Sequence, residues 1–238
     1  MAKPKLISLV GITASGKSAL GIKLAQEFNG EIVSCDSRQI YIGLDIGTAK
    51  VTQQEQALVK HHLIDVATPG KTFNVFDFQK MAYTAIDDIL ARGKVPILVG
   101  GSGLYSRSIV EGYGFKDKPH AKYNVLQICL VPPRETVEPL VIKRIDERLA
   151  QGMIAETEGL IKQGVSKDWL RSLGLEYFWN VQYIEGSVTI DEYKRRLKDK
   201  TMQFIKRQRT WFRKEKDTMY LTDDFHKKSF ELIKAFLN

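Results

Sequence analysis

An eight-residue loop near the start of the chain carries the clearest chemical signal in the sequence. Residues Gly11 to Ser18 are GITASGKS, which fits the pattern G-x-x-x-x-G-K-[ST]. Such a loop points its backbone N–H groups inward, and the helix that follows adds its N-terminal dipole. A lysine at position 17 supplies positive charge to terminal phosphates, and the Ser18 hydroxyl can hold Mg²⁺ or a phosphate oxygen. The sequence therefore predicts a phosphate-binding site made by Gly11, Thr13, Ala14, Ser15, Gly16, Lys17 and Ser18.

A carboxylate follows the second apolar run of the chain. The stretch EIVSCDSRQIY places Asp36 at the carboxyl end of an expected strand, the edge where open parallel sheets bind ligands. A carboxylate beside bound phosphates is a poor phosphate ligand, because like charges repel. The sequence leaves three roles open for Asp36: a metal ligand, a general base, or a cap on the following turn.

The phosphate loop alone is most typical of kinases and nucleoside triphosphatases. Those enzymes usually also place an aspartate at the end of an apolar strand to position the metal. The best candidate, Asp65 in the stretch LID, is weak, and the more apolar strand, in the stretch PILVGGSGLY, ends in Gly100 and Gly101 instead. Two glycines allow the backbone to approach a ligand closely. This pattern favours a substrate site over a nucleotide-driven motor.

Alternating strands and helices must position these groups. Strands are expected over 6–10, 31–34, 62–66, 95–99 and 125–131, with helices over 17–28, 53–60, 74–92 and 103–110. This alternation predicts an α/β fold of the P-loop type, with a parallel sheet flanked by helices. After Pro133 the pattern becomes mostly helical, over 136–151, 154–162, 167–185 and 191–216. We therefore divide the chain into a catalytic α/β core, 1–131, and a helical region that completes it, 132–238, with a polar connection at 113–122.

Composition and charge narrow the function classes. The chain has 238 residues, 43% hydrophobic and 27% charged, which is ordinary for a soluble globular protein. No apolar run is long enough to span a bilayer, and the two cysteines have no metal or disulfide spacing, so a cytoplasmic protein without a membrane partner is expected. Net charge is +8, yet residues 194–216 alone hold eleven Lys or Arg against two acids. Such a segment indicates a polyanionic partner, although a solvated helix face would also explain it.

Taken together, the motifs resemble one family. The stretches GITASGKS, DSRQIY, DIGTAK, HHLID, FNVFDF, PILVGGSGLY and FIKRQRTWFR occur in the order found in tRNA dimethylallyltransferases. The resemblance covers about residues 5–113 and 125–215. It implies transfer of a dimethylallyl group from dimethylallyl diphosphate to N6 of the adenosine beside the anticodon of tRNA, with Mg²⁺ as cofactor and diphosphate as leaving group. We expect a monomer.

The resemblance also implies roles for individual residues. Asp36 matches the family's general base, and Arg171, in DWLRSLGLEY, matches an arginine that reaches the diphosphate. Ser18 is the expected metal ligand and a member of the catalytic set. The resemblance further implies contacts with tRNA for Asp36, Ser37, Arg38, Gln39 and Ser102. The basic charge of the expected helix over 191–216 adds three expected tRNA contacts, which are Lys206, Arg207 and Arg209.

One departure from the family bears on the acceptor. The family normally carries a helical insertion after the LVGG-x-G-L-Y helix, which grips the anticodon stem and contains a His-x-Asn-Asp-x-x-Arg type motif. Here about a dozen residues join Gly112 to the strand at Val125, so insertion and motif are absent. Three alternatives therefore stay open: an adenylate isopentenyltransferase acting on free nucleotide, a small-molecule kinase, and a non-catalytic RNA-binding relative.

Overall fold

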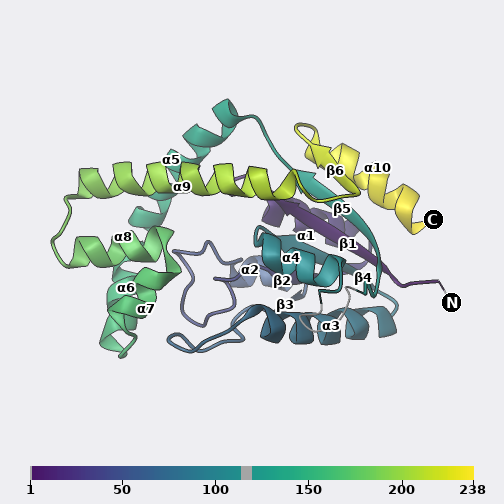
Figure 1. The fold of residues 1–238 in the computed structure, drawn as a ribbon, viewed down its shortest axis with the longest axis horizontal. Coiled ribbons are helices and arrows are strands. Elements are labelled where there is room, and N and C mark those ends of the chain that lie inside the picture. Colours follow the sequence, from purple (N-terminus) through teal and green to yellow (C-terminus); the bar gives the residue numbers. More distant parts are fainter. Residues whose placement is uncertain (1, 114–119) are drawn as a thin grey trace.

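The computed structural model describes residues 2–113 and 120–238, and these form one parallel sheet with helices on both faces (Figure 1). The strands are β1 (Lys5–Gly11), β2 (Gly30–Cys35), β3 (His61–His62), β4 (Val95–Gly100), β5 (Asn124–Leu130) and β6 (Thr218–Leu221). Their order across the sheet is β3-β2-β4-β1-β5-β6. The predicted fold class, a P-loop-type parallel sheet followed by a mostly helical part, is confirmed.

The register of the central strands brings three turns to one edge of the sheet. Gly100 of β4 lies opposite Val10 of β1 on one side and Cys35 of β2 on the other. The phosphate loop, the turn at Asp36 and the turn at Gly101 therefore begin at the same level. Parallel strands place all their carboxyl ends on one edge, which is where a ligand site is expected.

The two faces of the sheet bury alternate residues of each strand. On one face Ile7, Leu9 and Ile97 pack against α1 (Lys17–Glu27) and α10 (Phe225–Leu237). On the other face Leu6 and Leu98 pack against α3 (Val75–Ala91) and α4 (Gly103–Val110). Period-two alternation of this kind fixes the strand register, because a slip by one residue would exchange the two faces. Figure 1 shows α10 on one side of the sheet and α3 on the other.

The second half of the chain forms a helical group beside the carboxyl edge of the sheet. Its members are α5 (Arg134–Ala150), α6 (Met153–Lys162), α7 (Lys167–Leu173), α8 (Leu175–Ile184) and α9 (Ile190–Phe212). Helix α9 runs from this group back to the sheet (Figure 1). The buried positions of α9 recur every three or four residues, which is the spacing of one helix face: Tyr193, Leu197, Thr201, Ile205, Gln208 and Phe212.

Several elements differ from those expected from the sequence. The expected helix over 167–185 is two helices, because Gly174 takes φ +73° and ends α7 there. In place of the expected strand over 62–66, the structure has the two-residue strand β3, His61–His62. Helix α2 (Gln53–Leu58) is two residues shorter than the expected helix over 53–60. Strand β6 and helix α10 were not expected at all.

The expected connection over 113–122 lies partly outside the described residues, which resume at 120. Its two ends are close together, because His120 N–H donates to the Gly112 carbonyl at 3.1 Å. The division into 1–131 and 132–238 stays a prediction.

Candidate active site

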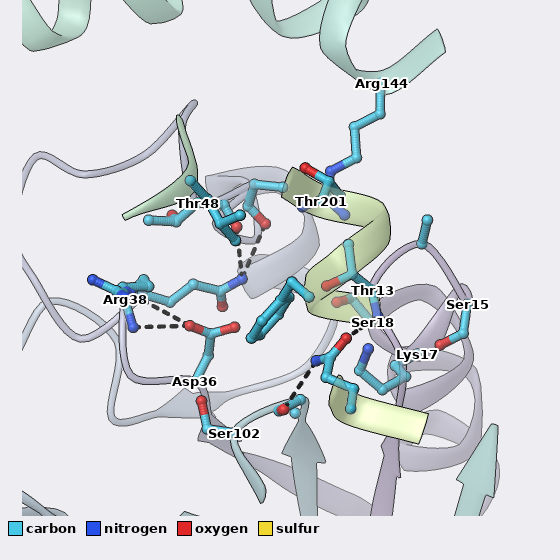
Figure 2. A pocket seen from close by; sticks show the side chains of 18 of the residues that line it. Thr13, Ser15, Lys17, Ser18, Asp36, Arg38, Thr48, Ser102, Arg144 and Thr201 are labelled. Carbon is cyan, nitrogen blue, oxygen red and sulfur yellow. Dashed lines mark hydrogen bonds between the residues drawn. The ribbon is translucent and has the colours of Figure 1, made fainter. Parts of the chain in front are cut away.

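A large cleft opens above the carboxyl edge of the sheet, with a volume of about 1690 Å³. The phosphate loop and the turns after β2 and β4 line it on the sheet side, and α5, α8 and α9 line it on the other. Figure 2 shows Lys17, Ser18 and Asp36 around this one space, and Arg38 also lines it. A concave site with several convergent polar groups is the usual form of a small-molecule site.

Two features of the phosphate loop bear on anion binding, the position of Lys17 and the state of the Ser15 hydroxyl. The Lys17 ammonium donates to the Ile12 carbonyl at 2.8 Å, so the loop curls around its own lysine. Burial, with a smaller contribution from Arg144, lowers the pKa of Lys17 to about 8, and the charge of Asp36 works against that shift. The Ser15 hydroxyl is buried and has no partner among the described residues. An unsatisfied buried hydroxyl in this loop indicates a ligand that supplies the missing partner.

Gln208 of α9 holds the phosphate loop in place, a role that the sequence analysis missed. Its Oε1 accepts from the Thr13 N–H at 2.9 Å, and its Nε2 donates to the Gly101 carbonyl at 3.1 Å. One buried amide, 6% exposed, thus joins the phosphate loop to the turn after β4. The signal was present in the sequence, since Gln208 falls on the apolar stripe of a basic helix, where a polar residue must find a partner.

Asp36 caps the turn after β2, which is one of the three roles that the sequence left open. Its Oδ1 accepts the backbone N–H groups of Arg38 at 2.8 Å and Gln39 at 3.4 Å, so the carboxylate caps the turn after β2. Its Oδ2 receives no hydrogen bond from the described part of the chain, and Asp36 is one of the residues that line the cleft. One oxygen therefore fixes the geometry and the other is free to act as a base.

The three residues after Asp36 make different contacts. The Ser37 N–H donates to Ser102 Oγ at 3.0 Å, which joins the turn after β2 to the turn after β4. Arg38 lines the cleft, makes no ion pair with any described residue, and burial lowers its pKa. Gln39 donates from Nε2 to the carbonyls of Thr48 and Ala49, so it supports a neighbouring loop.

Arg171 does not lie where the family resemblance placed it. Its guanidinium forms ion pairs with Asp168 at 2.6 Å and Glu185 at 2.5 Å, and it is not among the residues that line the cleft. These contacts tie α7 to the end of α8. The expectation that Arg171 reaches the diphosphate is therefore wrong in this structure, because the carboxylates of its own helical hairpin neutralise it.

Two arginines of α5 occupy the cleft instead, and the sequence analysis missed both. Figure 2 shows Arg144 reaching from its helix toward the phosphate loop. Burial, with a further contribution from Arg148, lowers its pKa to about 10. Arg148 donates from Nη1 to Glu176 at 2.6 Å. Nε of both arginines and Nη2 of Arg148 are buried without a partner in the described residues. A guanidinium group without an ion-pair partner that faces a phosphate loop, as that of Arg144 does, indicates an anion between the two.

This assignment predicts opposite outcomes for two arginines. A charge-assisted hydrogen bond contributes about 1.5–3 kcal/mol, so Arg144→Gln should weaken inorganic diphosphate binding by about 10- to 150-fold. Arg144 has no ion-pair partner among the described residues, so its removal should leave thermal stability intact. Arg171→Gln is the matched control and should leave diphosphate binding unchanged, measured by titration calorimetry. Loss of binding in the Arg171 variant alone would restore the original assignment.

The basic side chains of α9 differ in whether carboxylates of this chain already pair with them. In its first half Lys194 pairs with Asp146, Arg196 with Glu192 and Lys198 with Glu138. Toward its end Lys206 and Arg207 are exposed and line a second hollow of about 550 Å³ beside the cleft. Arg209 differs from them, because it donates to the Pro132 carbonyl on another side of the helix. The available charge is therefore concentrated at the mouth of the cleft.

Few groups in the cleft could hold a metal. Among the described residues no group of three or more His, Cys, Asp or Glu is arranged for a cation. Asp65, the weak candidate, lies outside the cleft lining and pairs with Lys50 at 2.5 Å. Ser18 and Asp36 remain, both in the cleft lining. This set suits a Mg²⁺ ion that keeps several waters and takes further oxygens from a phosphate substrate.

A family model described as IPP transferase matches residues 39–122 and 114–215 of this sequence. This chain belongs to the IPP transferase family. The tRNA dimethylallyltransferase of Caldicellulosiruptor saccharolyticus is 33% identical over 99% of both chains, and that of Streptococcus equi subsp. zooepidemicus is 37% identical over 90% of both. The full-length tRNA isopentenylpyrophosphate transferase of Bacillus halodurans superposes with a TM-score of 0.89 at 30% identity, covering 99% of this chain and 96% of that one. The predicted family is thus confirmed.

This IPP transferase is shorter than its relatives. The match to the C. saccharolyticus enzyme runs over 310 aligned positions, whereas this chain has 238 residues, so at least 72 positions have no counterpart here. The hydrogen bond from His120 to Gly112 closes the connection where the sequence analysis found an insertion missing. None of the described helices is long and apolar enough to cross a membrane.

Proposed function

We propose that this chain transfers a dimethylallyl group from dimethylallyl diphosphate to N6 of an adenosine in tRNA, next to the anticodon, and releases diphosphate. The observation that carries the proposal is that the phosphate loop and the free oxygen of Asp36 open on one cleft from neighbouring strand ends. A leaving diphosphate and a general base are the two groups that this reaction needs side by side.

The donor side of the cleft stabilises the leaving group. An allylic carbon ionises readily once the charge that develops on diphosphate is neutralised. The backbone N–H groups of the loop, Lys17 and Arg144 supply that neutralisation from fixed positions, which costs little reorganisation during the reaction. A bound Mg²⁺, held by Ser18 and substrate oxygens, would add further positive charge to the diphosphate.

The acceptor side supplies the base. The exocyclic amine of adenine is a poor nucleophile, so removal of its proton assists attack on the allylic carbon. Asp36 Oδ2 is the free carboxylate oxygen in the cleft, while Oδ1 keeps the turn rigid. An adenine inside an RNA loop must leave its stack to reach such a site, as in other base-modifying enzymes.

The other candidate functions are less well supported. P-loop kinases usually place a metal-positioning aspartate at the end of a further apolar strand, and the candidate for it, Asp65, lies outside the cleft lining and is bound to Lys50. An adenylate isopentenyltransferase would have the same donor site but would give no reason for exposed cations at the mouth of the cleft. A non-catalytic RNA-binding protein would have no need of a buried arginine, Arg144, that faces the phosphate loop without an ion-pair partner among the described residues.

One set of incubations separates these functions. Labelled dimethylallyl diphosphate and Mg²⁺ are supplied with unmodified tRNA or with AMP, and ATP is tested alone. We expect the label to enter tRNA and ATP to remain intact. Efficient labelling of AMP without labelling of tRNA would establish the free-nucleotide enzyme, and phosphate transfer from ATP would establish the kinase.

The proposed acceptor also predicts how binding depends on salt. Each phosphate contact contributes about one unit to the slope of log affinity against log salt, so Lys206→Gln with Arg207→Gln should flatten the slope for tRNA by about two units. The matched control is Arg195→Gln with Arg196→Gln on the same helix, where Glu192 already pairs with both arginines. An equal slope change in the control would contradict the placement of RNA at the cleft mouth.

A further inference from the structure

The side chain of Glu156, in α6, holds a loop of the cleft wall from behind. Its carboxylate accepts three consecutive backbone N–H groups, from Asp45 at 2.9 Å, Ile46 at 2.6 Å and Gly47 at 3.2 Å. It also accepts the Tyr177 hydroxyl at 2.8 Å. Successive N–H groups that converge in this way form an anion site, here filled by a carboxylate of the same chain. Hydrogen bonds to a charged acceptor are about twice as strong as neutral ones.

The loop that Glu156 holds reaches the proposed base through two further contacts. Gly47, Thr48 and Ala49 line the cleft. The carbonyls of Thr48 and Ala49 accept from Gln39 Nε2 at 3.4 and 3.1 Å, the contacts drawn beside Thr48 in Figure 2. The Gln39 N–H in turn donates to Asp36 Oδ1. A continuous set of hydrogen bonds thus runs from Glu156 to the carboxylate that faces the acceptor.

The support behind Glu156 is rigid. Tyr177 is 2% exposed, and Gly47 packs directly on it, since a Cβ at that position would lie 2.7 Å from the ring. Helix α6 is fixed by a buried network in which Asn180 donates to Thr157 at 2.8 Å and accepts from Tyr193 at 2.5 Å. A site built on helices locked by packing holds its side chains more precisely than a free loop does.

We propose that Glu156 is a positioning residue for the acceptor side of the reaction, which sets loop 45–49 and, through Gln39, the orientation of Asp36. This inference rests on the proposed function for the part that concerns turnover. The donor side is held independently, because Gln208 of α9 fixes the phosphate loop. Glu156 therefore acts on one half of the cleft, and its effect is separable from diphosphate binding.

The test is Glu156→Gln, which keeps the size of the side chain and removes its charge and one of its two acceptor oxygens. Backbone amides of 45–47 should exchange with deuterium about tenfold faster or more, while amides of the phosphate loop should be unchanged. A displacement of about 1 Å can cost about 10²-fold in rate, so kcat/KM for tRNA should fall by that order. Inorganic diphosphate should bind as in the wild type. Glu158→Gln is the matched control, an exposed carboxylate on the same helix.

The outcomes separate positioning from a general structural role. Unchanged exchange at 45–47 would overturn the inference, and so would equal losses of diphosphate binding and tRNA turnover. If wild-type protein transfers no dimethylallyl group, the proposed function fails, while the exchange measurement still decides whether Glu156 holds the loop. If Glu156→Gln does not fold, Tyr177→Phe replaces it, because it removes one hydrogen bond to the same carboxylate and should produce the same pattern more weakly.

Discussion

Asp36→Asn should lower turnover by about 10²- to 10⁴-fold while diphosphate binding persists, because the variant loses the oxygen that we propose takes the proton from the adenine amine. The substitution is well matched to the structure. Asparagine keeps a carbonyl oxygen that can accept the N–H groups of Arg38 and Gln39, as Oδ1 of Asp36 does. The turn after β2 should therefore survive. The loss should appear in the rate constant for dimethylallyl transfer, measured under single-turnover conditions.

The control for this prediction is Asp65→Asn. Asp65 is a carboxylate outside the cleft lining, so its variant should retain near-normal turnover. Thermal melting of both variants checks that they are folded. Near-normal turnover in Asp36→Asn would remove the general base from the mechanism and leave leaving-group stabilisation as the main source of catalysis.

Lys17→Met should lower kcat/KM for the donor by about 10²- to 10³-fold, the usual effect of removing one preorganised group that stabilises developing negative charge. Methionine fills a similar volume in a partly buried position. Lys23→Met is the matched control, since Lys23 lies on the exposed side of the same helix α1. Inorganic diphosphate should inhibit the wild type and the control by competing with the donor, and it should inhibit Lys17→Met far less. Equal inhibition of all three proteins would contradict the assignment.

The lowered pKa of Lys17 adds a pH dependence to the same prediction. An ammonium is charged below its pKa, so in the free protein Lys17 is charged below a pH of about 8 and loses its charge above it. Diphosphate affinity should therefore decrease as the pH rises past 8. In Lys17→Met this step should be missing, whereas any change due to ionisation of diphosphate itself should remain. A step of the same size in the variant would assign it to another group.

Local patterns predicted the parts of the site that lie within one stretch of chain. The phosphate loop needs a strand, two glycines, a lysine and a helix in immediate succession, and all of these are contiguous from Lys5 to Glu27. The turn at Asp36 is likewise local, since it follows β2 directly. The helix boundaries expected from the sequence agree closely with the structure where the cap is strong. An example is Asn74, which forms a complete capping box with Asp77.

The parts of the site that depend on packing could not be predicted in this way. Arg144 and Arg148 lie four residues apart on α5, which places them on one helix face, yet nothing local shows that this face meets the phosphate loop. Arg171 was misplaced for the same reason, because its partner Glu185 lies at the end of the next helix. Strand β6 is only four residues long, and its pairing with β5 is a long-range contact that periodicity does not reveal.

The most direct test of the account is nucleoside mass analysis of unmodified tRNA after incubation with this chain, dimethylallyl diphosphate and Mg²⁺. We predict that one adenosine per tRNA gains a dimethylallyl group in place of a hydrogen on N6, that this adenosine lies next to the anticodon, and that Asp36→Asn gives little of the product. Unmodified tRNA after incubation with folded wild-type protein that binds diphosphate would contradict the proposed reaction.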